Sequence, residues 1–175
     1  MEDIIMVNEK VHALLNAQIN KEFYSAYLYL DFSNYFKQKG LDGFANWYLI
    51  QAQEERDHAM LFYTYLQNEN MTVTLDAIDK PEKTFNSHMS VLEAGLEHEK
   101  YVTSLINDIY AAAYEVKDFR TMQFLDWFVK EQGEEETNAN DLISKMELFG
   151  SDPRGLYLLN QELGTRVYNA PSLVL

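Results

Sequence analysis

Apolar residues recur every three or four positions over long stretches of the chain, which is the spacing of one face of an α-helix. Gly40, Gly150 and Gly164 stand where three of these stretches end, as glycine commonly does at helix ends. The fold class is therefore predicted to be all-α. Helices are expected at residues 8–38, 43–70, 88–116, 119–149 and 153–163, with a loosely held tail at 165–175.

Polar residues that favour helix N-termini precede three of the predicted helices. The segment 90–93, Ser-Val-Leu-Glu, has the form of a capping box, so the third helix is expected to begin near Ser87 or Ser90. Asp118 is placed to cap the fourth helix, and Asp152, which precedes a proline, to cap the short fifth one.

Residues 71–86, with Pro81 among them, break the helical pattern. About 16 extended residues span about 50 Å, whereas a helix of about 27 residues is about 40 Å long. The segment can therefore run the full length of a bundle, so that the third helix starts at the same end as the second. We predict a four-helix bundle with one long crossover between the second and third helices and a short fifth helix.

The bulk composition restricts the class of protein further. With 175 residues, 47% of them hydrophobic, the chain can form one domain with a substantial core, taken as residues 1–175. A net charge of -14 argues against binding a nucleic-acid backbone or an anionic membrane surface, and it attracts cations. The absence of cysteine excludes a disulfide framework, a thiolate metal site and a cysteine nucleophile.

The chain also lacks the signals that would direct it to a membrane. No window approaches the roughly 20 apolar residues of a membrane span. The first five residues have neither the basic start nor the apolar run of a signal peptide. A cytoplasmic location is therefore expected.

One acidic residue interrupts the apolar face of each long predicted helix: Glu22, Glu55, Glu99 and Glu135 in turn. In the second helix His58 follows Glu55 by one turn. Burying an ionised carboxylate is costly unless a cation or a hydrogen-bond donor compensates it. For a single Glu-x-x-His, the ordinary interpretation is that the two side chains pair with each other or with a core partner.

The positions of these residues repeat between the two halves of the chain. Glu22 and Glu99 lie 77 positions apart. Four inward carboxylates near a bundle centre would repel one another strongly without cations, and carboxylates with a single histidine suit iron or manganese. We therefore predict a site for two metal ions. The same offset of 77 positions relates the polar pair of the second helix, Glu55 and His58, to the pair of the fourth helix, Gln132 and Glu135.

The two halves differ in one ligand. The first half provides the imidazole of His58 where the second provides only the amide of Gln132. Glu55 is placed to bridge the two ions. The second site is then all-oxygen and weaker, which suits an ion that must leave after oxidation.

The chain resembles the non-haem bacterial and archaeal ferritins over essentially its full length. The resemblance implies the bundle described above, assembled as a hollow homo-oligomer of 24 subunits. It also implies a ferroxidase centre, whose first iron is held by Glu22, Glu55 and His58 and whose second iron is held by Glu55, Glu99 and Glu135, with Gln132, Tyr29 and Trp127 close by. The segments that carry it are 20–29, 53–58, 124–128, 131–136 and 155–163, together with Glu99.

Three further glutamates match a third, transit iron site of the bacterial branch. They are Glu54, Glu131 and Glu134, with Glu135 shared. Because they lie at the edge of the apolar face, a solvated acidic surface is the alternative, and Glu136 is assigned to plain surface. Taken without the resemblance, Tyr29 is interpreted as a core residue whose hydroxyl is satisfied rather than as a functional residue.

Two related families are set aside on sequence grounds. Haem-binding bacterioferritins carry a methionine after the bridging glutamate and a second Glu-x-x-His, where this chain has Arg56 and Gln132, so no haem is expected. Rubrerythrins add an iron domain that needs cysteines. The remaining histidines, His12, His88 and His98, match no motif and are assigned to the surface or to subunit contacts, with an auxiliary metal-binding role as the alternative.

The sequence thus predicts an iron storage and detoxification protein with ferroxidase activity. Iron(II) would be oxidised by dioxygen or hydrogen peroxide and stored as a ferric mineral inside the shell. The first alternative is a di-iron or di-manganese oxidase acting on an organic substrate or peroxide. The second is a metal-free structural bundle, in which Gln in place of Glu22, Glu55 or Glu99 would be neutral or stabilising.

Overall fold

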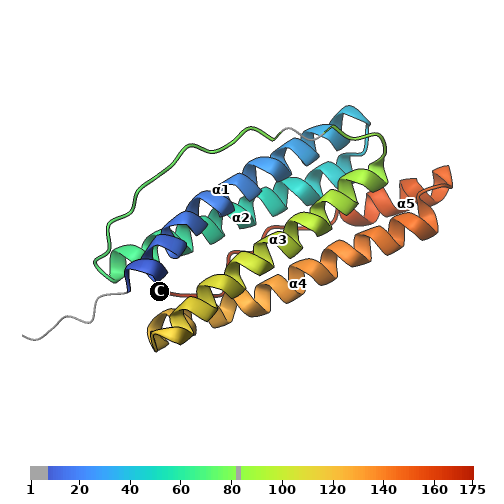
Figure 1. Cartoon of the computed structure of the whole chain (residues 1–175). Coiled ribbons are helices and arrows are strands. Elements are labelled where there is room, and N and C mark those ends of the chain that lie inside the picture. Colours follow the sequence, from blue (N-terminus) through green and yellow to red (C-terminus); the bar gives the residue numbers. More distant parts are fainter. Residues whose placement is uncertain (1–7, 82–83) are drawn as a thin grey trace, which may run out of the picture.

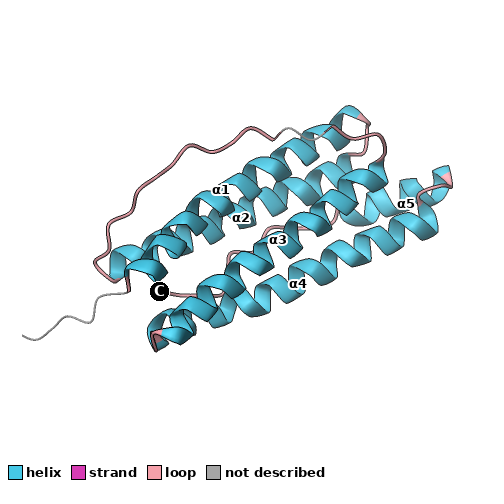
Figure 2. Ribbon diagram, in the orientation of Figure 1, coloured by secondary structure: helices cyan, strands magenta, loops and turns pink. Residues whose placement is uncertain are grey.

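The computed structural model describes residues 8–81 and 84–175 and contains, over those ranges, five helices and no strand (Figure 1, Figure 2). This confirms the predicted all-α fold. Within the described ranges, none of the helices is both long and apolar enough to cross a membrane. The helices are α1 (Glu9–Gln38), α2 (Asp42–Asn68), α3 (His88–Glu115), α4 (Phe119–Phe149) and α5 (Pro153–Leu163).

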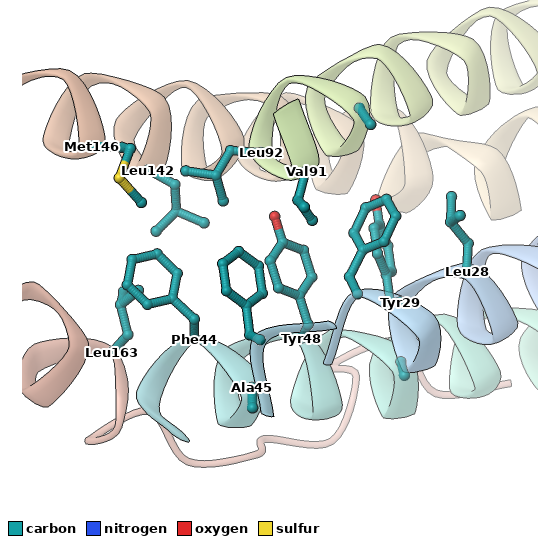
Figure 3. Packing of buried hydrophobic residues seen from close by; sticks show 14 of the residues in the cluster. Leu28, Tyr29, Phe44, Ala45, Tyr48, Val91, Leu92, Leu142, Met146 and Leu163 are labelled. Carbon is teal, nitrogen blue, oxygen red and sulfur yellow. The ribbon is translucent and has the colours of Figure 1, made fainter. Parts of the chain in front are cut away.

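The four long helices form a bundle in which α1 packs on α2 and α3 packs on α4, and α5 packs against α2 and α4 at one end (Figure 1). Two apolar clusters fill the interior. One contains Val11 and Phe62, and the other contains Phe44 and Leu142. Figure 3 shows the second cluster, where side chains of α2 point toward those of α3 and α4. On every long helix the residues between the two clusters include a buried glutamate.

The segment between α2 and α3 runs along α1 for the length of the bundle, as predicted (Figure 1). Polar residues of α1 at four-residue spacing hold it there. His12 Nε2 donates to the carbonyl of Thr72 at 2.8 Å, and Asn16 Nδ2 donates to the carbonyl of Thr74 at 3.0 Å. The spacing of one helical turn explains why one face of α1 can bind an extended chain repeatedly.

All five described helices begin within one residue of the predicted starts. Asp118 and Asp152 cap α4 and α5, as predicted. The capping box of α3, however, is formed by Ser87 and Ser90, so the predicted box at 90–93 is wrong. Ser87 has the extended backbone of a cap residue (φ −153°, ψ 164°), and its hydroxyl accepts the Ser90 N–H at 3.1 Å. A serine at either position satisfies the motif, and the backbone conformation selects the earlier one.

The N-terminus of α2 has no side-chain cap of its own and takes one from α5. Asn160 Oδ1 accepts the N–H groups of Gly43 at 2.8 Å and Phe44 at 3.3 Å. The approach is so close that a Cβ at Gly43 would lie 1.6 Å from the carbonyl oxygen of Asn160. The fifth helix is therefore fastened to the second by a contact that requires glycine.

The tail after α5 is held against the bundle, so the expectation of a loosely held tail is wrong. The Tyr168 hydroxyl donates to Asp57, and Trp127 Nε1 donates to Ser172 Oγ at 3.0 Å. Leu173 packs against the apolar cluster that contains Val11. The C-terminus accordingly lies at the end of the bundle where α1 begins (Figure 1). These contacts join residues far apart in sequence, which a local pattern cannot reveal.

A matched pair of glycine substitutions tests the docking of α5. Gly43→Ala is expected to lower the free energy of unfolding by about 1–3 kcal/mol, because the added methyl overlaps the α5 backbone. Gly133→Ala, inside α4, meets nothing within 4 Å and is expected to raise it by about 0.4–1 kcal/mol. Urea unfolding of the metal-free protein measures both. Equal stabilities of the two variants would show that α5 does not need this contact.

Candidate metal centre

A single polar layer crosses the bundle between its two apolar clusters. All of its members have side chains exposed by 5% or less. They come from all four long helices, and the structure therefore brings the predicted centre residues into one buried layer. The layer contains Glu22, Glu55, His58, Glu99, Gln132 and Glu135.

The first part of the layer is formed by Glu22, Glu55 and His58, whose potential ligand atoms all lie within 4.8 Å of one another. Glu55 Oε2 is 3.4 Å from His58 Nδ1, and Gln18 Nε2 donates to Glu22 Oε1 at 2.8 Å. The other oxygens of the two carboxylates, Glu22 Oε2 and Glu55 Oε1, are the buried side-chain polar atoms of the described residues that have no hydrogen-bond partner. Glu55 and His58 therefore lie close enough to pair, but one oxygen of Glu55 and one of Glu22 still lack a partner among the described residues. A bound cation would satisfy both oxygens.

The second part of the layer contains Glu99 and Glu135, which are held by hydrogen bonds. The Tyr29 hydroxyl donates to Glu99 Oε1, and Gln132 Nε2 donates to Glu99 Oε2 at 3.2 Å. Gln51 Nε2 donates to Glu135 Oε2 at 2.5 Å. A small cavity of about 20 Å³ borders Glu99 and Glu135, enough for one water-sized occupant.

Burial dominates the electrostatics of the layer. Loss of solvation raises the pKa of Glu22, Glu55 and Glu135 and raises the pKa of Glu99 to about 7. For Glu55, the charges of Glu99 and Glu22 raise the pKa further. For Glu22, the neighbouring His58 acts in the opposite direction. Without a cation the layer therefore retains protons near neutral pH, and a cation that binds must displace them.

Tyr29 belongs to the apolar cluster that contains Phe44, and its hydroxyl donates to Glu99 of the polar layer. Burial, followed by the charge of Glu99, holds the pKa of this hydroxyl well above its ordinary value. Tyr29 thus remains a neutral donor, which suits a core residue as well as a residue of the centre. The Trp127 ring lies with its centroid 5.5 Å from that of His58.

The three glutamates assigned to a third site do not converge in the described part of the chain. Glu131 Oε1 lies 4.0 Å from His58 Nε2, at the edge of the polar layer. Glu134 is largely exposed and pairs with Lys130 at 3.6 Å. Glu54 forms an ion pair with Arg166 of the tail at 2.5 Å. The third site therefore stays a prediction, and in this conformation Glu54 already has a cationic partner.

Sequence reasoning missed two of the glutamines that support the carboxylates, Gln18 and Gln51. Gln18 lies four residues before Glu22, and Gln51 four residues before Glu55, so both are on the same helix face as a buried acid. That spacing was a usable signal. No such spacing could have indicated Arg166, because it is separated from its partner Gln51 by 115 positions of sequence.

The assignment of His98 to the surface is wrong. Its side chain is 8% exposed, and its Nε2 is hydrogen-bonded to Ser25 Oγ at 2.7 Å. The rings of Tyr24 and Tyr29 pack beside it, each with a centroid distance of 5.9 Å. By contrast, His88 is half-buried beside Tyr35. His98 is therefore a satisfied core residue of the α1–α3 contact.

A family model, curated relatives and solved structures that are similar to this chain all belong to the same protein family. Residues 12–149 match the family model described as a ferritin-like domain. The chain is 40% identical over 156 residues to a bacterial non-heme ferritin of Campylobacter jejuni, covering 89% of this chain and 93% of the relative. It is 38% identical to a probable bacterial non-heme ferritin-like protein of Haemophilus influenzae, covering 91% and 96%. A solved structure of an open pore ferritin from Archaeoglobus fulgidus superposes with a TM-score of 0.90 at 42% identity, covering 92% and 98%.

The raised pKa of Glu22 predicts how the metal-free protein responds to pH. The folded state holds this proton to a higher pH than the unfolded state does, so ionisation lowers stability as pH rises through the folded pKa. Glu22→Gln resembles the protonated acid. It is expected to raise the free energy of unfolding at about pH 8 and to have little effect at about pH 5, measured by urea unfolding without metal.

The exposed Glu93→Gln is the matched control and is expected to change stability at neither pH. Addition of Zn²⁺ should then stabilise the parent more than the Glu22→Gln variant, since Glu22 would be a ligand of only the first of the two ions. A variant that is less stable than the parent at both pH values would contradict this account of the buried charge.

Proposed function

The chain belongs to the ferritin family, of the non-haem bacterial and archaeal type, so its function is iron storage, and we propose that it oxidises iron(II) at the polar layer of its bundle. One observation carries the proposal: two buried carboxylate oxygens beside His58 have no partner among the described residues. A fully satisfied structural core would leave no such atoms. Two divalent cations supply the missing charge.

The ligands of the two irons follow from the layer. Glu22, Glu55 and His58 would hold the first iron, and Glu55, Glu99 and Glu135 the second, with Glu55 bridging. The hydrogen bonds from Gln18 to Glu22 and from Gln51 to Glu135 leave the remaining oxygen of each carboxylate free to face a metal ion. Such supporting bonds orient ligands and tune their basicity.

The proposed reaction balances with two irons at the centre. Two iron(II) ions give up two electrons, which with two protons reduce one dioxygen to hydrogen peroxide, or one hydrogen peroxide to two waters. Carboxyl groups with raised pKa release protons when iron binds. Once ionised, they stabilise the iron(III) that forms.

The two irons would be held unequally. Gln132 donates its amide to Glu99 and to the Glu99 carbonyl, so it supports a ligand where His58 provides one. The second position is therefore all-oxygen. We assign to it the iron that moves on after oxidation and is stored as a ferric mineral.

Assembly into a hollow shell of 24 copies is part of the proposal. The faces of α1 and α2 that point away from the bundle carry large exposed apolar side chains, among them Tyr27 at 54% and Leu49 at 53%. Such residues commonly lie at subunit contacts. Sedimentation of the purified protein is expected to give a particle of about 24 chains. A monomer or dimer would favour the small-oxidase alternative.

Aerobic iron(II) titration of the metal-free protein tests the function directly. We expect fast oxidation of about two irons per chain, followed by slower growth of a soluble ferric core. His58→Ala should lower the initial rate by about 10- to 100-fold or more, because it removes the only nitrogen ligand. Absorbance of iron(III) follows both phases.

His12→Ala is the control, because His12 contacts the crossover segment and not the polar layer. It is expected to keep the rate of the parent. Oxidation of two irons without core growth would indicate the oxidase alternative. An unchanged rate in His58→Ala would place the chemistry elsewhere.

A further inference from the structure

The tail brings one guanidinium to the edge of the polar layer, and that group is held on several sides. Arg166 Nη2 donates to Glu54 Oε2 at 2.5 Å, and Nη1 donates to Gln51 Oε1 at 2.7 Å and to the Trp47 carbonyl at 3.3 Å. The guanidinium carbon lies 4.1 Å from the centroid of the Trp47 ring. The Arg166 and Glu54 side chains are 16% and 17% exposed. The guanidinium is therefore held in a largely buried pocket by charged, polar and aromatic groups, unlike an ion pair on a solvated surface.

Arg166 also fixes the orientation of Gln51. An amide can present either its oxygen or its nitrogen, but a guanidinium can only donate, so the oxygen of Gln51 must face Arg166. The amide nitrogen then faces Glu135, to which it donates at 2.5 Å. Through one side chain, Arg166 therefore acts on a proposed iron ligand.

At Glu54 the guanidinium binds one of the two carboxylate oxygens, Oε2. Glu54 is part of an acidic edge that includes Glu131, which lies beside His58. The negative charge of Glu131 and the positive charge of Arg166 both act on the Glu54 carboxylate. Arg166 therefore supplies, within the chain, the positive charge that this edge would otherwise take from solution.

We propose that Arg166 is the resident cation of the acidic edge: it excludes a metal ion from Glu54 and, through Gln51, positions Glu135. This inference rests on the proposed iron centre and concerns which positions around it accept metal. Arg166 is a positioning and specificity-determining residue rather than a ligand. A metal ion can bind at Glu54 only when the guanidinium leaves, which requires the tail to move from its place on α2.

Zinc binding to the full-length, assembled, metal-free protein tests the proposal without iron oxidation. Isothermal titration calorimetry with Zn²⁺ is expected to show about one more ion per chain in Arg166→Ala than in the parent. Arg166→Gln, which keeps much of the side-chain volume, should gain the same ion. Adding Glu54→Gln to either variant should remove the gain, which would assign the new ion to Glu54.

Two further variants separate charge from tail attachment. Arg166→Lys keeps a cation and is expected to restore the number of zinc ions bound by the parent. Tyr168→Phe removes the tail contact to Asp57 but keeps Arg166, and is expected to bind the parental number. An equal zinc count in the parent, Arg166→Ala and Arg166→Gln would overturn the proposal. So would a gain that Arg166→Lys does not reverse.

Failure of the proposed iron centre would give a different result. In that case the parent itself would bind fewer than about two zinc ions per chain, and His58→Ala would not reduce the number. The effect of Arg166 is the difference in the number of bound zinc ions between the parent and the Arg166 variants. It can therefore be measured whatever number of ions the parent binds.

Discussion

Loss of solvation by four glutamates in one layer of the bundle is the constraint on which the rest of the structure depends. Carboxylates this deeply buried and this close together are stable only when protons or cations reduce their charge. The structure supplies partial compensation with Gln18, Gln51 and Gln132, each of which donates to a carboxylate. Among the described residues, two buried carboxylate oxygens remain without a hydrogen-bond partner, and both belong to residues of the group that could hold a metal ion.

The apolar clusters on either side of the layer make that arrangement possible. Aromatic side chains pack tightly at both ends, such as Phe36 on Phe44 with centroids 4.9 Å apart and Tyr65 on Phe124 with centroids 4.1 Å apart. Their burial stabilises the bundle and offsets the cost of the polar layer. The fold can therefore keep several buried carboxylates in one layer.

The C-terminal part of the chain has a different role from the bundle. Asn160 caps α2, and Arg166 contacts the same helix two turns further along, at Gln51 and Glu54. Both contacts act on α2, which carries Glu55 and His58. The fifth helix and the tail thus link the end of the bundle to its polar layer. A change in the position of the tail would first alter the contacts of Arg166 with Gln51 and Glu54.

The sequence by itself determined the helices, the crossover and the membership of the polar layer, because these follow from periodicity along a rigid helix. Glu22, Glu55, His58, Glu99 and Glu135 were found in this way, although their function as ligands is still to be measured. Only the tertiary structure decided the contacts between distant segments. Ser25 with His98, Gly43 with Asn160 and Gln51 with Arg166 are separated by 73, 117 and 115 positions. No local pattern encodes such pairs, since packing sets which surfaces meet. For the same reason, the sequence did not show that Glu54 has an arginine partner.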